Sequence, residues 1–373
     1  MSLPRLRTVL DTMPSYQPSE GVYASERRPR LLSANESPHQ PLSGITEAIA
    51  RAGATVNRYP DPGCAALTRS LARTHGIDED RIVVGAGSVA LLQTLFQAIA
   101  DPGAEVVHAW PSFELYPVLA ELAGVTCVPV PLTDGTHDLR TMADRITPRT
   151  RLVVVCNPNN PTGTVADPDE LARFIARIPP TCLVALDEAY FEYVRSPAVT
   201  NGLEYGLAHP NIVVLRTFSK AYGLAGLRVG YLVGDARVTR RLRKAGLAYA
   251  VSAVAQHAAV EALVLQEQLM RRVDDTVAER TRVREALLRD GWAIPASEAN
   301  FLWLPLGEDA AAFGQWCTHQ GIAVRAFPGE GVRVTVGSRE DNDVFLTAAA
   351  TWRTTRPWAV APRARTEHGT GEE

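Results

Sequence analysis

A serine, a lysine and an arginine that lie near one another in the sequence could together bind and transform a small anionic molecule. Ser219 and Lys220 are adjacent, and seven residues separate Lys220 from Arg228. An arginine in mostly apolar surroundings favours an anion with several oxygens that it can grip bidentately, such as a phosphate or a carboxylate. A lysine amine forms an imine once it has lost its proton, a reaction that is closed to a guanidinium. The spacing therefore indicates a site that combines anion binding with amine chemistry.

Lysine is rare in this chain, which adds weight to Lys220. Lysine and arginine together number 38, yet only Lys220 and Lys244 are lysines. A lysine retained in such a sequence is expected to do something that arginine cannot do. The alternative is an ordinary surface lysine at the end of a strand. The apolar run before Lys220 and the hydroxyl residues beside it favour the chemical role.

An acid and a tyrosine follow another apolar run. Asp187 ends the run that begins at Leu183, and Tyr190 lies three residues further on. A buried carboxylate needs a cationic partner. That partner is either an arginine or the protonated pyridine nitrogen of a ligand, whose ring the pairing would keep an electron sink. Tyr190 could reach a phenolic oxygen of the same ring, or it could be a half-buried structural tyrosine.

Two turns offer further binding groups. The Gly-Ala-Gly-Ser-Val sequence at 85–89 lies between a predicted strand and a predicted helix, where backbone N–H groups and the helix dipole favour an anion. It matches neither the Rossmann fingerprint nor a P-loop, and many such turns only reverse the chain. The loop 157–163 holds two prolines and a glycine, so it is a stiff turn that could hold Asn157 toward a ligand.

Two arginines occur in apolar, strand-like runs near the C-terminal end. Arg333 lies in the run 331–336, and Arg325 precedes it by eight residues. Each could bind a carboxylate or phosphate of a substrate. Each could also point outward to solvent.

The elements that position these residues follow an α/β pattern. Continuous apolar runs alternate with helical patterns from about residue 80 to 235, which is typical of strands buried on both faces of a mostly parallel sheet. Ligands bind at the carboxyl ends of the strands in such sheets, where the candidate residues fall. The predicted strands are 81–85, 105–109, 125–130, 151–156, 182–186 and 212–215, and the predicted helices are 89–100, 113–123 and 168–178.

The pattern changes after residue 250, and a length of 373 residues exceeds what one core usually organises. A long helix is predicted over 253–289, followed by strands 301–304, 322–325 and 332–336 with helices 310–319 and 341–352. We therefore expect a large domain over 46–260 and a smaller α+β domain over 261–355. An N-terminal segment, 1–45, would pack on the small domain, and the polar tail 356–373 would be disordered.

Composition excludes several classes of protein. The formal net charge of −3 argues against nucleic-acid binding, and no apolar run approaches the ~20 residues that span a bilayer. The N-terminus has no apolar stretch of a secretory signal. The five cysteines are scattered without a metal-binding pattern, so we expect no metal site and reduced thiols in a cytoplasmic protein.

Together these segments resemble fold-type-I pyridoxal-phosphate enzymes, and more narrowly the bacterial histidinol-phosphate and aromatic amino acid aminotransferases. The resemblance covers roughly residues 6–352. It is carried by Ser-Ala-Asn-Glu-Ser-Pro at 33–38, Asn-Arg-Tyr-Pro-Asp at 57–61, the loop 157–163, Asp-Glu-Ala-Tyr at 187–190, the block 217–228 and the strand 332–336. The fold it implies is a large domain with a mostly parallel sheet between helices, plus a smaller α+β domain.

The resemblance implies a role for each matching residue. Lys220 would hold pyridoxal 5′-phosphate as an imine and carry protons, and Asp187 would pair with the pyridine nitrogen. Tyr190 and Asn157 would bond the phenolic oxygen, and Phe113 would stack on the ring. The phosphate would lie among Gly87, Ser88, Val89, Ser219 and Arg228. Tyr59 would reach the cofactor of the partner subunit in a homodimer. The substrate-side residues implied are Arg333, Arg325, Asn35 and Tyr16.

The link between the two arginines bears on the substrate. It is longer in typical histidinol-phosphate enzymes, and here only 326–332 separates them. With the sequence 110–117, this resembles the phenylalanine-type aminotransferases. We therefore expect transfer of an amino group between an aromatic amino acid and a 2-oxo acid such as 2-oxoglutarate. Histidinol-phosphate aminotransferase is the second hypothesis. A decarboxylase of the same fold and a non-catalytic pyridoxal-phosphate sensor are the remaining ones.

Overall fold

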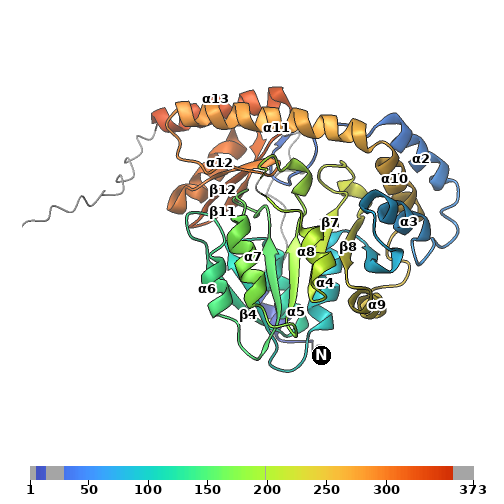
Figure 1. The fold of residues 1–373 in the computed structure, drawn as a ribbon. Coiled ribbons are helices and arrows are strands. Elements are labelled where there is room, and N and C mark those ends of the chain that lie inside the picture. Colours follow the sequence, from blue (N-terminus) through green and yellow to red (C-terminus); the bar gives the residue numbers. More distant parts are fainter. Residues whose placement is uncertain (1–5, 14–28, 198, 356–373) are drawn as a thin grey trace, which may run out of the picture.

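The computed structural model describes residues 6–13, 29–197 and 199–355. The expectations for Tyr16 and for the tail 356–373 lie outside these residues. The described chain contains a seven-stranded sheet, a three-stranded sheet and a two-stranded pairing. Figure 1 shows the large sheet with helices around it and the long helix α11 running across the molecule toward the small sheet. None of the described helices is long and apolar enough to cross a membrane.

The seven-stranded sheet has the order β2-β8-β7-β6-β5-β3-β4. Strand β8 runs antiparallel to both of its neighbours, and the remaining pairs are parallel. The strands are β2 (Ile82–Gly85), β3 (Glu105–Trp110), β4 (Thr126–Pro131), β5 (Thr150–Cys156), β6 (Leu183–Asp187), β7 (Ile212–Thr217) and β8 (Gly230–Gly234).

The central strands are buried on both faces, as their continuous apolar runs predict. In β5, Val153 and Val155 belong to one apolar cluster, whereas Leu152 and Val154 belong to the other. The helices that pack on one face are α4 (Ser88–Ala98), α5 (Leu115–Ala123) and α9 (Ala236–Ala245). Those on the other face are α3 (Ala65–His75), α6 (Leu139–Asp144), α7 (Pro168–Arg177), α8 (Gly202–Ala208) and α10 (Ala253–Val264), with α2 (Ser43–Gly53) packed on α10.

A second core lies around the three-stranded sheet β11-β12-β9. Leu32 packs in this core, and β1 pairs in parallel with β10, so the segment that follows residue 29 lies on this part of the molecule. Its elements are β1 (Arg30–Leu31), α11 (Gln266–Arg289), β9 (Phe301–Leu304), α12 (Ala310–His319), β10 (Ile322–Ala323), β11 (Arg325–Phe327), β12 (Gly331–Thr335) and α13 (Arg339–Thr355). Short elements complete the described chain: α1 (Val9–Thr12) and the 3-10 turns Glu79–Arg81, Phe191–Tyr193, Ala225–Leu227 and Gly307–Asp309.

Two predicted elements are wrong in their extent. The single helix over 253–289 is divided into α10 and α11 at Leu265, although the sequence there has neither glycine nor proline. The break lets α10 pack on α2 and α3 while α11 continues to α13. The strand over 322–325 is also two strands, β10 and β11, which belong to different sheets. Tertiary packing overrides local propensity in both places.

Candidate active site

A cavity of about 270 Å³ lies at the carboxyl ends of β6 and β7, where it borders the small sheet. Glu36, Glu114 and Asn160 are among its walls. The predicted site residues that line it are Asn35, Ser88, Val89, Phe113, Asp187, Tyr190, Ser219, Lys220, Arg228 and Arg333. The structure therefore brings most of the predicted site together.

Lys220 follows β7 through a short turn that Thr217 stabilises by accepting a hydrogen bond from the Ser219 amide, 3.1 Å. Its Nζ donates to the carbonyl oxygen of Ala34 at 2.9 Å. Burial, and next the charge of Arg333, lower the pKa of the Lys220 amine to about 7. An amine with this pKa is available in its neutral, nucleophilic form near neutral pH.

Asp187 ends β6 and is held by only one of its carboxylate oxygens. The phenol of Tyr116 in α5 donates to Oδ2 at 2.8 Å. Oδ1 is buried and has no hydrogen-bond partner among the described residues. Burial raises the pKa of Asp187 to about 6, although the Tyr116 hydrogen bond acts in the opposite direction. A buried acceptor without a donor fits the protonated nitrogen of a heterocyclic ligand.

An anion cradle forms where the start of α4 meets Arg228. Gly87 has φ of 82°, and a Cβ at this position would lie 2.6 Å from Nη2 of Arg228. Arg228 has a φ of 53°, in the left-handed region, and its Nη1 donates to the Ser219 hydroxyl at 3.2 Å. Ser88 begins the helix. A helix N-terminus, hydroxyl groups and a guanidinium together fit a phosphate.

Gly230 in β8 joins the two halves of this cradle. It pairs with Gly85 of β2 on one side and with Thr217 of β7 on the other. A Cβ on Gly230 would lie 2.8 Å from the Ser88 amide nitrogen and 2.9 Å from the Arg216 carbonyl oxygen. The absence of a side chain therefore lets the start of α4 approach the Lys220 segment.

Asn35 and Asn157 have partners that the sequence did not predict. Asn35 is buried and donates through Nδ2 to the Tyr190 hydroxyl at 3.0 Å, while its Oδ1 accepts from the Thr335 hydroxyl at 3.1 Å. It therefore orients Tyr190, whose pKa burial raises. Asn157 is buried but is not among the residues that line the cavity; its Oδ1 accepts from the Ala166 amide at 2.9 Å. The cavity instead contacts Asn160 of the same loop.

The two small-sheet arginines have different partners. Arg333 is buried and donates to Oδ1 of Asn160 and to the carbonyl oxygen of Ser33. Arg325 does not line the cavity and forms an ion pair with Glu114, with Nη2 and Oε1 2.6 Å apart.

Tyr59 lies away from this cavity and is 83% exposed. Its ring packs on Tyr249, with centroids 4.8 Å apart. Further exposed apolar side chains are Val56, Leu247 and Val264.

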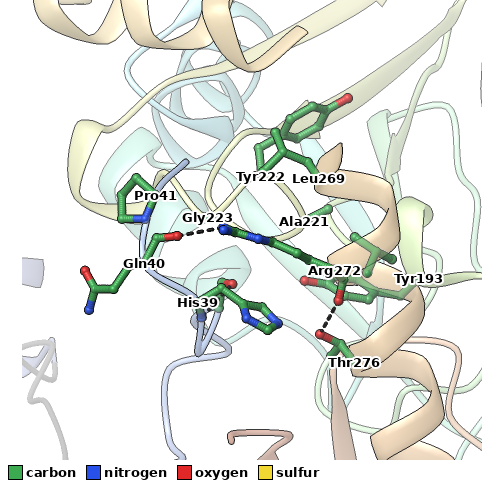
Figure 2. A pocket seen from close by; sticks show the side chains of 12 residues that line it. His39, Gln40, Pro41, Tyr193, Ala221, Tyr222, Gly223, Leu269, Arg272 and Thr276 are labelled. Atoms are coloured by element: carbon green, nitrogen blue, oxygen red, sulfur yellow. Dashed lines mark hydrogen bonds between the residues drawn. The ribbon is translucent and has the colours of Figure 1, made fainter. Parts of the chain in front are cut away.

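A second, small pocket lies behind the lysine segment, between the chain at 37–41 and α11 (Figure 2). Arg272 extends from α11, and its Nη1 donates to the Gln40 carbonyl oxygen at 2.6 Å. Ala221, Tyr222 and Gly223 form the opposite wall. Burial, and next the Arg272 charge, lower the pKa of His39. Arg272 thus fixes the segment at Gln40 to α11, on the far side of the pocket from the residues that follow Lys220.

Tyr116 and Glu114 belong to the site although the sequence did not single them out. Tyr116 is fully buried one helical turn after Phe113, and the two rings meet edge to face, with centroids 5.5 Å apart. A tyrosine on the apolar face of a buried helix needs a partner for its hydroxyl, and this was the available signal. Glu114 had no comparable signal, because its partner comes from a distant strand.

Comparison with known proteins identifies the family. Residues 30–348 match the family described as aminotransferase class I and II. The chain belongs to this family. An aromatic amino acid aminotransferase of Thermobifida fusca is 54% identical over 94% of this chain and 97% of its own. Another, of Streptomyces coelicolor, is 48% identical over 94% and 98%. The crystal structure of histidinol-phosphate aminotransferase from Sinorhizobium meliloti with pyridoxal-5′-phosphate superposes with a TM-score of 0.88, at 27% identity over 95% and 99%.

These aminotransferases confirm the family and the α/β fold of type I that the sequence resemblance implied. The chain is therefore an aminotransferase, as predicted. The roles of individual residues and the division into domains stay predictions.

Proposed function

We propose that this aminotransferase uses pyridoxal 5′-phosphate to move an amino group between an aromatic amino acid of the phenylalanine or tyrosine type and a 2-oxo acid such as 2-oxoglutarate. The observation that carries the cofactor assignment is a pair of groups that line one cavity. These are the Lys220 amine, whose pKa is about 7, and the buried Asp187 carboxylate, one oxygen of which has no partner among the described residues. The names of the relatives support the aromatic substrate.

The residues present fit this cofactor at each of its functional groups. Lys220 would bind its carbonyl carbon and Asp187 its pyridine nitrogen. Tyr190 and Asn157 would bond the phenolic oxygen, and Phe113 would cover one ring face. The phosphate would lie in the cradle that is formed by Gly87, Ser88, Val89, Ser219 and Arg228. When bound, the cofactor supplies an electron sink for carbanion chemistry at the substrate Cα.

The protein's own groups then carry the proton transfers. With the cofactor bound, the neutral Lys220 amine would take the proton from the substrate Cα and later return a proton. Asp187 would keep the pyridine nitrogen protonated, and Tyr116 fixes the carboxylate in position. Arg333 binds the substrate carboxylate; its Cζ lies 5.5 Å from the Phe301 ring centroid and 6.0 Å from that of Phe327.

A homodimer completes the proposal. Tyr59, Val56, Leu247 and Val264 are apolar or aromatic side chains with more than half of their surface exposed. Exposed apolar groups of this kind mark protein–protein contacts. In the proposed dimer Tyr59 reaches the cofactor phosphate of the partner subunit. The cytoplasmic location stays a prediction from the sequence.

The test is a paired half-reaction assay on protein reconstituted with pyridoxal 5′-phosphate. The absorbance of the bound cofactor is recorded with L-phenylalanine and with L-histidinol phosphate, each with and without 2-oxoglutarate. We expect phenylalanine to remove the absorption band and 2-oxoglutarate to restore it. A response to histidinol phosphate alone would establish the second hypothesis. Release of CO₂ without an oxo-acid acceptor would identify a decarboxylase, and absence of any band would overturn the role of Lys220.

A further inference from the structure

Two arginines lie side by side on the small sheet, and one of them, Arg333, lines the cavity. Arg325 of β11 and Arg333 of β12 are direct partners in an antiparallel pair. Side chains of such partners project from the same face of a sheet, and like charges in this position repel each other. The small sheet therefore presents two positive charges together. The groups that pair with these two guanidinium groups decide how many negative charges a bound substrate can carry.

The two guanidinium groups have different partners. Arg333 donates to the side-chain oxygen of Asn160 and to the carbonyl oxygen of Ser33. Arg325 is gripped by a carboxylate: Glu114 accepts from Nε at 3.2 Å and from Nη2 at 2.6 Å. Two parallel hydrogen bonds between ionised groups make this a strong pair. Its side chains are 21% and 29% exposed, so solvent screens the pair only in part.

The backbone position of Glu114 favours the ion pair with Arg325. It follows Phe113 directly, lines the cavity and immediately precedes α5, which runs from Leu115 to Ala123. The start of a helix favours a negative charge. The carboxylate is thus held at the cavity wall from the large sheet's side, while its partner comes from the small sheet.

We propose that Glu114 is a specificity-determining residue: it occupies Arg325 and so favours substrates with an uncharged side chain over those with a second anionic group. This inference deepens the proposed function and rests on it. An aromatic amino acid meets Arg333 with its carboxylate and a neutral ion pair beside its side chain. A second carboxylate or a phosphate binds Arg325 only by displacing Glu114, whose charge then loses its guanidinium partner. The dicarboxylic 2-oxo acid has to make this exchange in each cycle.

The test measures binding of two unreactive analogues to the cofactor-loaded protein. Glutarate carries two carboxylates, and 3-phenylpropanoate carries one carboxylate and a phenyl ring. The quantity is the ratio of their dissociation constants, 3-phenylpropanoate over glutarate. We expect Glu114→Gln to raise this ratio by about tenfold, because glutarate no longer competes with a charged partner of Arg325.

Three controls separate this effect from others. Glu121→Gln removes an exposed carboxylate from the same helix and should leave the ratio within about twofold, since exposed charges far from a ligand are screened. In an Arg325→Met background, Glu114→Gln should no longer raise the ratio. Cofactor absorbance and thermal unfolding show that each variant is folded and loaded.

The inference is overturned if the ratio stays the same in Glu114→Gln, or if it rises equally in the Arg325→Met background. Its failure differs from failure of the proposed function. If the wild-type protein neither binds 3-phenylpropanoate nor reacts with phenylalanine, the aromatic substrate is wrong. The change in the dissociation constant of glutarate on Glu114→Gln still shows whether Glu114 competes with glutarate for Arg325.

Discussion

The phenol of Tyr116 donates a 2.8 Å hydrogen bond to one carboxylate oxygen of Asp187, while the other oxygen is buried and has no hydrogen-bond partner in the part of the chain that the structure describes. Asp187 is thereby fixed in orientation while one acceptor faces the cavity. A carboxylate held in this way is prepared for a single cationic group.

Tyr116→Phe should weaken catalysis without removing the site. The substitution deletes a hydrogen bond that lowers the pKa of Asp187, so this pKa should rise above its present value of about 6 in the cofactor-free protein. We expect kcat to fall on the order of tenfold, since an orienting bond to a charged group contributes about 1.5 kcal/mol. Steady-state kinetics measure this effect. An unchanged kcat would show that Tyr116 only fills space.

Stability of the cofactor-free protein should depend on pH through Lys220. Its folded pKa of about 7 lies below the ordinary lysine value of 10.5, so the folded state binds fewer protons than the unfolded state between these two values. The free energy of unfolding should therefore increase as pH rises from about 7 toward 10, by up to ~1.4 kcal/mol per pH unit from this group.

Lys220→Met isolates this contribution. The variant should be more stable than wild type at pH 6, where the buried amine is charged, and its advantage should shrink as pH rises. Urea denaturation of both cofactor-free proteins at pH 6, 8 and 9.5 measures the difference. An advantage that is independent of pH would contradict a lowered pKa for the Lys220 amine.

Gly87→Ala should damage the anion cradle. The new methyl group would lie 2.6 Å from Nη2 of Arg228, at a backbone φ of 82° that side chains rarely adopt. We expect the dissociation constant for pyridoxal 5′-phosphate to increase at least about tenfold, because Arg228 has to move. Fluorescence titration measures it. Gly53→Ala is the control, because no atom of the described residues lies within 4 Å of its Cβ position; an equal loss there would indicate a general effect.

Arg272→Met should loosen the segment that covers Lys220. It removes the 2.6 Å hydrogen bond to the Gln40 carbonyl oxygen that Figure 2 shows. We expect a loss of about 1 kcal/mol in the free energy of unfolding, together with a several-fold lower kcat/KM. Arg271→Met is the matched control, because this neighbour is exposed and pairs only with Glu267 of the same helix in the hydrogen bonds and ion pairs described. Its effect should stay within about 0.5 kcal/mol.

Much of the fold and of the site could be predicted because the residues concerned carry local signals. Lys220 and Asp187 follow continuous apolar runs, and the carboxyl ends of neighbouring parallel strands meet at one edge. Their convergence in one cavity follows from that rule. The family resemblance added Phe113 and Asn35, which no local pattern singles out.

The remaining features depend on contacts between distant segments. The ion pair between Glu114 and Arg325 and the hydrogen bond between Asn35 and Tyr190 join segments that are distant in the sequence. They form only when the small sheet packs beside the large one. The helix breaks at Leu265 because α10 and α11 pack against different partners. No glycine or proline in the sequence marks this break. Side-chain partners of this kind are a property of the tertiary structure, and periodicity does not encode them.

The insertion of β8 between β2 and β7 has a consequence for the order of events during synthesis. One half of the anion cradle, at Ser88, is made early, whereas Ser219 and Arg228 emerge much later. The two halves are brought together through Gly230, which pairs with both flanking strands. A nascent chain thus has no complete cradle until β8 has left the ribosome and taken its place. Binding of the cofactor therefore requires the complete sheet, so the cofactor cannot assist the early stages of folding of this sheet.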